Sequence, residues 1–421
     1  MSTFAVQNQK SSVSSILRGL VAFGSAELAN RIVRILVVII IARQLAPDLV
    51  GVAALTLSLF ELIRVIANIG VGQKIIAAHD SDLAATCIAA HRIFWIWCSI
   101  VAAIQLVAAA LLHFYFEQSL AAQMLAILCG VYFFMPGGLV QCFRLMRTKK
   151  LAKVAKIGAV QTITDHILTG ILVFIWASPW AIVIPKLMTA PLWLVMMRHA
   201  DDWRPDLATA AAPYKDMLNF GAAILATDIF LAVRNNLDKL IISAFLGVSA
   251  LGTYYFAFNA GIGIVSALAT AFGTVIFPHL CNKKDQAQNR TIIHFSVAAG
   301  LAIFGSLTAV QYFLAPIYVP IIFGSHWVHA IPLIQVLSLA GIPLAMSAIA
   351  SAYLRAEGRA PLDAWFGLTV CVLALMTMLI GAQWGLLSAA TGWVLGTSIV
   401  IISYTLFLST QPVSKFKEVF Q

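Results

Sequence analysis

The sequence predicts an all-α integral membrane protein with about twelve transmembrane helices in two six-helix bundles. Three observations support this fold class. Of 421 residues, 61% are hydrophobic and only 10% are charged, whereas soluble domains use about 45–50% apolar and about 25% charged residues. Twelve apolar runs are long enough to cross a bilayer as helices, which takes about 20 residues. Lys and Arg residues gather in alternate loops.

The apolar runs are continuous over helical lengths. Strands of a membrane barrel would instead alternate in polarity over about ten residues, so the runs favour helices. The predicted spans are residues 20–42, 49–72, 88–112, 121–143, 156–177, 179–198, 217–245, 250–278, 291–314, 329–354, 361–381 and 384–408.

The positive charges predict the orientation, because cytoplasmic loops retain Lys and Arg. If the N-terminus is inside, twenty of the 27 Lys and Arg residues lie in inner segments, Arg43 lies in an outer segment, and six lie within spans. This distribution favours an even number of helices with both termini cytoplasmic. It also argues against nucleic acid as a partner, since the net charge of +10 belongs to short loops at a membrane surface.

The longest polar interruption lies between the sixth and seventh spans and predicts the domain boundary. We expect an N-terminal lobe over 1–199, a cytoplasmic linker over 200–216 and a C-terminal lobe over 217–421.

A short internal repeat relates the two lobes. IIARQLAPDLVGVAALTLSL begins at Ile40 and ISAFLGVSALGTYYFAFN at Ile242, and each carries a glycine, Gly51 or Gly252, that opens the next helix. Six helices separate the copies, so the repeat is parallel. Repeats of this kind place a transport site between the halves.

Other chemistries lack their sequence signatures. The six cysteines are scattered through apolar runs without a CxxC pair, which argues against a zinc site or disulfides. There is no GxxxxGK[ST], HExxH or GxSxG motif, so we expect no nucleotide hydrolysis, no catalytic residues, no metal and no cofactor.

Ionisable residues within spans are the candidate functional residues, because a charge at mid-membrane costs at least about 2.5–3.5 kcal/mol and normally faces a protein interior or an aqueous cavity. The cationic candidates are Arg31, Arg34, Arg64, Arg234 and Lys239. The carboxylates, as ion-pair partners or coupling groups, are Glu27, Glu61, Asp165, Asp228 and Asp238.

Helical spacing groups these residues on shared faces. Glu27, Arg31 and Arg34 follow one face of the first span, and Arg234 and Asp238 form an i, i+4 pair in the seventh. Two interpretations stay open. The cations line a wet, net-positive cavity and bind a phosphate or pyrophosphate, or they are internal ion pairs that hold helices together.

The fifth span carries Asp165 beside His166. This pair is either a proton or sodium site or a satisfied polar seam between helices. Lys186 is expected near the inner end of a tilted helix.

Three segments resemble a known family. They are FGSAELANRIVRILVVIIIARQLAPDLVGVAALTLSLFELIRVIANIGVGQKII from Phe23, VRNNLDKLIISAFLGVSALGTYYFAFN from Val233 and FGSHWVHAIPLIQVLSLAG from Phe323. They are similar to segments of the bacterial oligosaccharide flippases of surface-polysaccharide assembly, which share a superfamily with multidrug extruders and lipid II flippases.

The resemblance implies a V-shaped pair of six-helix bundles that works by alternating access in the bacterial inner membrane. The implied cargo is an undecaprenyl-pyrophosphate-linked oligosaccharide, whose pyrophosphate and sugars enter a cavity with Arg31, Arg34, Arg64, Arg234 and Lys239 as its cations. Membrane lipids and a polysaccharide polymerase complex are the other expected partners.

Three alternatives remain. A cation-coupled drug or metabolite extruder of the same fold would have a carboxylate-lined aromatic cavity with few cations. A scaffold within a polysaccharide synthesis complex would have little need for mid-membrane arginines. A membrane enzyme would need a large outer loop, and the longest one, near 315–329, offers only His326 and His329.

Overall fold

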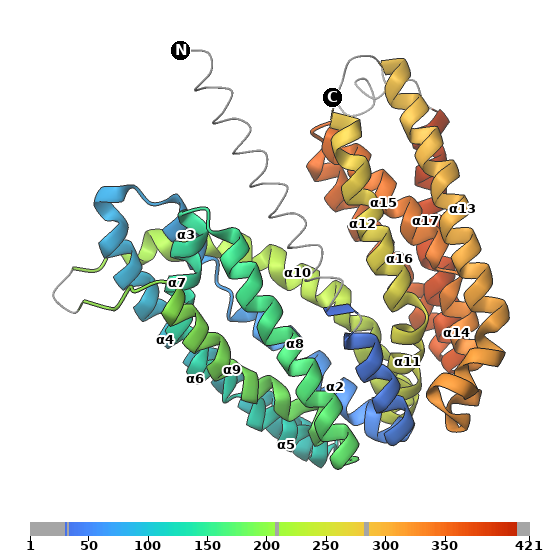
Figure 1. Cartoon of the computed structure of the whole chain (residues 1–421), viewed down its shortest axis with the longest axis horizontal. Coiled ribbons are helices and arrows are strands. Elements are labelled where there is room, and N and C mark those ends of the chain that lie inside the picture. Colours follow the sequence, from blue (N-terminus) through green and yellow to red (C-terminus); the bar gives the residue numbers. More distant parts are fainter. Residues whose placement is uncertain (1–29, 32, 207–209, 282–285, 411–421) are drawn as a thin grey trace. The chain divides into compact units, whose positions relative to one another are not determined.

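The structure is a computed structural model that describes residues 30–31, 33–206, 210–281 and 286–410 (Figure 1). The described residues contain no strand. Residues 30–31 and 33–44 are helical. The longer helices that follow are α2 (Pro47–Ile66), α4 (Leu83–Phe114), α7 (Pro136–Arg147), α8 (Leu151–Ile175), α9 (Trp180–Ala200), α10 (Tyr214–Leu246), α11 (Val248–Ala260), α12 (Ile262–Cys281), α13 (Gln286–Tyr318), α15 (Gly341–Ala356), α16 (Ala360–Ala382) and α17 (Leu386–Thr410).

Shorter elements join them. The short helices are α3 (Val71–Ala77), α5 (Ser119–Leu128), α6 (Val131–Phe134) and α14 (Ile331–Ser338). Two 3₁₀ segments, Asp80–Asp82 and Ser325–Ala330, and one π segment, Val319–Phe323, complete the chain.

Each of the twelve predicted spans is mainly helical where it is described, and several contain short non-helical breaks. Within the described residues, eight helices are long and apolar enough to cross a membrane, and the count rises to nine if the bent pair Ser119–Phe134 and Pro136–Arg147 forms one span. A total of twelve crossings therefore stays a prediction.

Four of the predicted spans are interrupted, and glycine or proline stands at each break. The run 49–72 breaks at Gly70, whose φ of 71° is left-handed. The run 121–143 bends by 53° before Pro136, where the ring removes a backbone donor. The run 250–278 divides at Gly261, and 329–354 divides just before Gly341.

The described chain divides into two compact units. Unit 1 takes Met1–Leu45 with Leu55–Asn236, and unit 2 takes Ala46–Ala54 with Leu237–Gln421. The division falls inside α2 and inside α10, so each of these helices contributes one part to each unit. The predicted lobes, 1–199 and 217–421 with a linker between them, stay a prediction.

The core of unit 1 fixes the segment that follows α2. Buried Val71 and Ile75 of α3 pack with Phe94 of α4 and Phe143 of α7. A Cβ at Gly72 would lie 1.9 Å from the Phe143 ring, so only glycine allows this approach. The packing holds the break between α2 and α3 in place at the side of α10.

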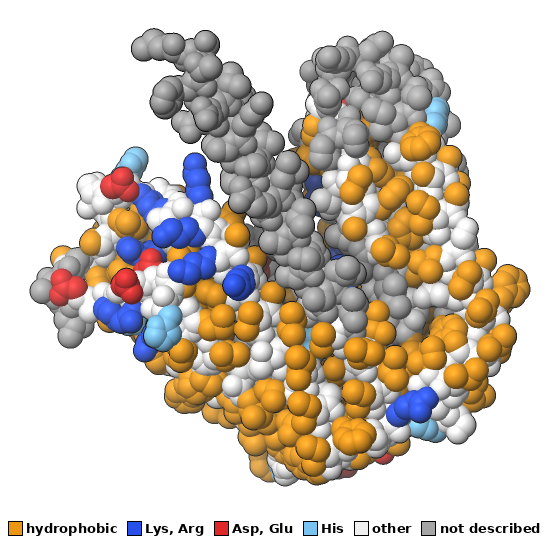
Figure 2. Space-filling view, in the orientation of Figure 1, with side chains coloured by type: hydrophobic (Ala, Val, Ile, Leu, Met, Phe, Trp, Pro, Cys, Tyr) orange, Lys and Arg blue, Asp and Glu red, His pale blue; other side chains and the backbone are white. Residues whose placement is uncertain are grey.

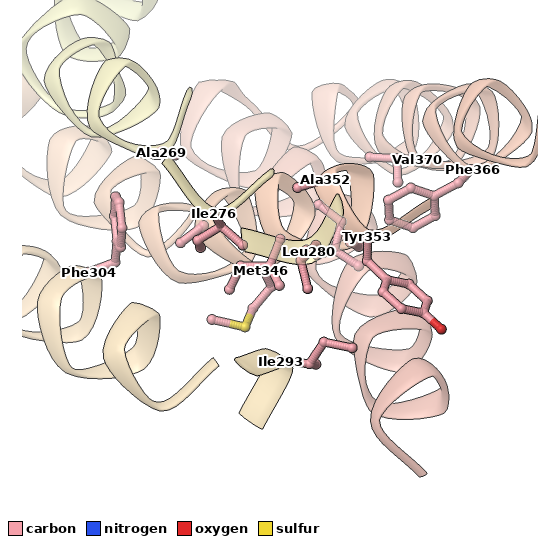
Figure 3. Close-up of a cluster of buried hydrophobic side chains, with 14 of the residues drawn as sticks. Ala269, Ile276, Leu280, Ile293, Phe304, Met346, Ala352, Tyr353, Phe366 and Val370 are labelled. Atoms are coloured by element: carbon pink, nitrogen blue, oxygen red, sulfur yellow. The ribbon is translucent and has the colours of Figure 1, made fainter. Parts of the chain in front are cut away.

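The core of unit 2 is built from α12, α13, α15, α16 and α17, and Figure 3 shows its side chains converging from these helices. Its buried residues include Ile276 and Leu280 of α12, Phe304 of α13 and Met346 of α15. The close-packed small residues of α12 and α15 are typical of helix interfaces in membranes.

The outer surfaces of both units are apolar along the helices. Ile96, Val107, Phe174 and Phe313 are exposed, and hydrophobic side chains cover most of the face in Figure 2. Such side chains are stable when they face lipid. A multi-pass membrane protein follows from these surfaces and from the long apolar helices.

Basic side chains gather at the end of unit 1 that carries α3 and α7 (Figure 2). Two ion pairs tie this end together. Arg147 Nη2 lies 2.6 Å from Asp80 Oδ1, and Arg144 Nε lies 3.0 Å from Asp201 Oδ1. Exposed lysines follow directly, at 149, 150, 153 and 156.

Candidate functional site

Unit 1 contains a cavity of about 780 Å³ whose lining includes charged and polar side chains among apolar ones. Residues of α2, α6 to α10 and the segment after α2 line it. Its charged lining residues are Glu61, Arg64, Asp165, Lys186 and Asp228. Its amides, hydroxyls and rings include Asn68, Gln161, Thr162, His166, Thr189, Trp193, Asn235 and Asn236. The volume lies within the usual range of small-molecule sites, about 300–1,000 Å³.

Asp165 and Lys186 face each other across the hairpin of α8 and α9. Lys186 Nζ lies 3.6 Å from Asp165 Oδ2. Asp165 lies ten residues before the end of α8 and Lys186 six residues after the start of α9. The long lysine side chain spans the difference of about one turn, which is 5.4 Å. The pair is largely buried, since Asp165 is only 9% exposed.

Helix 33–44 packs beside α8 at the same level. A Cβ at Gly170 would lie 3.3 Å from Val37 Cγ2, so the two helices approach closely there. One turn earlier in both helices, Arg34 lies near enough to His166 to interact with it electrostatically, as do Asp165 and Lys186.

Glu61 and Arg64 form an ion pair on α2 and also line the cavity. Arg64 Nη2 lies 2.7 Å and Nε 3.1 Å from Glu61 Oε2. Their spacing of three residues places them on one face of the helix. Both side chains keep about a third or more of their surface exposed, 35% for Glu61 and 45% for Arg64, so the pair is hydrated and adds little stability.

Asp228 enters the cavity from α10 and accepts a hydrogen bond of 2.8 Å from Asn68 Nδ2. Two turns earlier, Gly221 allows α10 to press against the break after α2, since a Cβ there would lie 2.0 Å from the carbonyl oxygen of Ile69. The Trp97 indole donates to the carbonyl of Ile66 at 2.6 Å and holds the end of α2. These contacts set the distance between Asn68 and Asp228.

The cavity brings together four of the predicted site residues, Glu61, Arg64, Asp165 and Asp228. Arg31 is half-buried and Arg34 is exposed, in the helical residues 30–31 and 33–44, and both take part in polar or electrostatic contacts. Arg234 is exposed on α10. None of these three lines the cavity in the described part of the chain. Glu27 lies outside the described residues.

Asp238 and Lys239 belong to unit 2 and contact each other. Lys239 Nζ lies 3.2 Å from Asp238 Oδ1, and the Tyr254 hydroxyl donates to Asp238 Oδ2 at 3.0 Å. Lys239 Nζ also stands 5.5 Å from the centre of the Phe258 ring. Asp238 thus has Lys239 of its own helix and Tyr254 of α11 as partners, and its pairing with Arg234 stays a prediction.

Lys186 is the charged residue whose role the sequence-based prediction missed. It was expected near the inner end of a tilted helix, but it lines the cavity and pairs with Asp165. A usable signal existed. After Lys156, Asp165 is the one Asp, Glu, Lys or Arg of α8, and before Arg198, Lys186 is the one such residue of α9, so a hairpin of these helices predicts the pair.

Comparison with known proteins identifies the family. Residues 40–332 match the family described as polysaccharide biosynthesis protein. Relatives are the lipopolysaccharide biosynthesis protein WzxC of Escherichia coli K12, 24% identical over 65% of this chain, and the teichuronic acid biosynthesis protein TuaB of Bacillus subtilis 168, 23% identical over 70%. The chain spans 56% and 60% of the lengths of these two relatives.

A third relative is the succinoglycan biosynthesis transport protein ExoT of Rhizobium meliloti 1021, 21% identical over 87% of this chain and 74% of its own.

Solved structures show the same fold. The lipid II flippase MurJ in an inward closed conformation superposes with a TM-score of 0.72 at 12% identity, covering 94% of this chain and 89% of its own. An inward-facing multidrug resistance MATE family transporter of the MOP superfamily gives 0.69 at 14% identity, covering 93% of this chain and 96% of its own. The fold is thus the all-α membrane transporter fold of these proteins, and the chain belongs to the polysaccharide biosynthesis protein family.

Proposed function

We propose that this protein is a flippase that moves undecaprenyl-pyrophosphate-linked oligosaccharides from the inner to the outer leaflet of the bacterial cytoplasmic membrane by alternating access. The cavity of unit 1 carries the proposal. Five charged side chains and four amides line a space of about 780 Å³ inside a unit whose outer surface is apolar. A polar interior of this kind costs free energy in a membrane protein and indicates a polar cargo.

The family supports the nature of the cargo. This chain belongs to the polysaccharide biosynthesis protein family, and its relative ExoT is described as a transport protein of succinoglycan biosynthesis. A membrane protein that serves polysaccharide assembly by transport would carry lipid-linked sugar units, and the polymerase that uses them would be its functional partner.

The predicted cations are the proposed contacts with the pyrophosphate. Arg64 and Lys239 each have a carboxylate within 3.2 Å, so a diphosphate would have to compete with Glu61 or Asp238 there. The proposal puts the main contacts on Arg31, Arg34 and Arg234, because their guanidinium forks suit phosphate oxygens and because, in the described part of the chain, they do not line the carboxylate-bearing cavity of unit 1.

A second candidate is a cation-coupled extruder of the same fold. The cavity favours it in one respect, because its described lining has three carboxylates against two cations and includes the rings of Phe60 and Trp193. Organic cations would be the cargo of such a site.

Complementation of flippase-deficient strains distinguishes the flippase from the extruder. Strains that lack their own flippase, each with a different repeat unit, should regain surface polymer when they express this protein, while efflux of an organic cation such as ethidium should stay at the control level. Efflux without restored polymer in any strain would favour the extruder.

A further inference from the structure

The cavity of unit 1 is rich in hydrogen-bond acceptors. Three carboxylates, Glu61, Asp165 and Asp228, face two cations, and each cation already has a carboxylate beside it. An ionised carboxylate only accepts hydrogen bonds. As described, the lining has no excess positive charge with which to attract an anion.

The Asp165 carboxylate includes a hydrogen-bond acceptor that no described donor satisfies. Asp165 is only 9% exposed, and its Oδ1 atom has no hydrogen-bond partner among the described residues. A buried, unsatisfied carboxylate oxygen is costly. Asp165 lines the cavity and 13% of its side chain is exposed, so a donor on a bound molecule can approach the carboxyl group from that space, although a small side-chain rotation is needed to present the buried Oδ1 atom.

The nearby hydroxyls add further acceptors. Thr162 donates to the carbonyl of Gly158 at 2.9 Å, and Thr189 donates to that of Pro185 at 3.0 Å. Since each hydroxyl proton is used within its own helix, each oxygen offers lone pairs to the cavity. The amide of Gln161 supplies both a donor and an acceptor beside them.

The pyrophosphate and the sugars of the proposed cargo differ in their hydrogen-bond donors and acceptors. A pyrophosphate diester carries negative charge and acceptors but no donors, so carboxylates and hydroxyl lone pairs repel it. Sugar hydroxyls are donors as well as acceptors, and the Trp193 ring offers an apolar face of the kind that packs on a pyranose.

We propose that the unit 1 cavity is a subsite for an uncharged, hydroxyl-rich sugar of the cargo and that it excludes the pyrophosphate. Asp165 and Gln161 are its specificity-determining residues, and Lys186 positions the Asp165 carboxylate. This inference rests on the proposed flippase function.

The export profile tests the subsite. The panel of flippase-deficient strains is complemented with wild type, Gln161→Leu, Asp165→Asn and the control Thr164→Val, which lies on the same helix but outside the lining. The subsite variants should change the ratio of export between repeat units by about tenfold, the effect of one hydrogen bond to a ligand. Thr164→Val should keep the wild-type ratio. An equal loss for all repeat units would overturn the proposal.

Direct binding separates this inference from the flippase function. Purified full-length protein in lipid nanodiscs is titrated calorimetrically with the phosphate-free repeat units released by mild acid from the lipid-linked pool of each strain, and with inorganic pyrophosphate. At least one repeat unit should bind, weaken about tenfold in Gln161→Leu and resist displacement by pyrophosphate.

Three results would overturn the subsite. They are binding by none of the repeat units, displacement by pyrophosphate that depends on Gln161, or Asp165-dependent binding of sodium alone. If wild type restores no polymer in any strain, the flippase proposal fails, while the sugar titrations still report on the cavity.

Discussion

Gly51 of α2 and Gly252 of α11 meet within unit 2 in a reciprocal contact. A Cβ added to Gly51 would lie 1.9 Å from the carbonyl oxygen of Val248, and one added to Gly252 would lie 1.7 Å from that of Pro47. The two copies of the sequence repeat therefore lie side by side in the structure: the first turns of α2 and α11 cross with their backbones in close contact. Close crossings at small residues are a main source of helix association in membranes.

Gly51→Ala and Gly252→Ala should each destabilise the protein. The obstructing atoms are backbone carbonyls, which cannot rotate away, so the helices must separate at a cost of about 1–3 kcal/mol or more. Thermal unfolding of the purified protein measures the loss. Gly305→Ala is the matched control, because a Cβ there meets nothing within 4 Å and the change should be neutral or stabilising. Equal melting temperatures for the three variants would contradict the close crossing.

The Asp165 and Lys186 pair should show coupling. Lys186→Met leaves a carboxylate buried without its cation, and Asp165→Asn removes the partner of the lysine, so each change should destabilise by about 1–3 kcal/mol. The double variant should be more stable than the sum of the single effects predicts, by about 1 kcal/mol, when melting is compared in a double-mutant cycle.

The control for this cycle is the hydrated pair on α2. Glu61→Gln and Arg64→Met should give a coupling of only about 0–1 kcal/mol, because both side chains keep about a third or more of their surface exposed. A strictly additive Asp165 and Lys186 cycle would mean that the separation of 3.6 Å does not hold in the membrane.

Labelling of single cysteines should place the basic end of unit 1 in the cytoplasm. Exposed Cys281 is first replaced by Ser. A membrane-impermeant maleimide should then label Lys150→Cys, between α7 and α8, only after the cells are permeabilised. It should label Glu117→Cys in intact cells, because Glu117 lies in the loop between α4 and α5, which the positive charges predict to be outside. The reverse pattern would invert the predicted topology.

Sequence could predict the helices because length and polarity decide them locally. The apolar runs around α4, α8, α9 and α16 match the observed helices closely. The breaks escaped prediction because they depend on tertiary packing. Gly261 divides α11 from α12, whereas Gly305 continues α13 without interruption, and no local pattern distinguishes the two.

The candidate residues could be recognised from the sequence because a charged side chain within a membrane span costs free energy. Their partners could not, because these depend on the neighbouring helices. Glu61 and Arg64 share one helix, so spacing alone relates them. Asp238 instead meets Tyr254 of α11, and Asp228 meets Asn68. Such pairs follow from helix crossings that helical periodicity does not contain.

Three arginine substitutions test the proposed pyrophosphate contacts. Arg31→Ala, Arg34→Ala and Arg234→Ala each remove a guanidinium that would hold a phosphate through charge-assisted hydrogen bonds, which contribute about 1.5–3 kcal/mol each. At matched membrane expression, at least two of the three should lower polymer export about tenfold or more for every repeat unit that wild type exports. Arg43→Ala is the control, since this residue lies exposed on the same helix as Arg34 near its far end. Normal export in all three would assign these arginines to internal ion pairs. A loss restricted to some repeat units would instead place them at the sugar, because a contact with the pyrophosphate, which all cargoes share, must weaken them all alike.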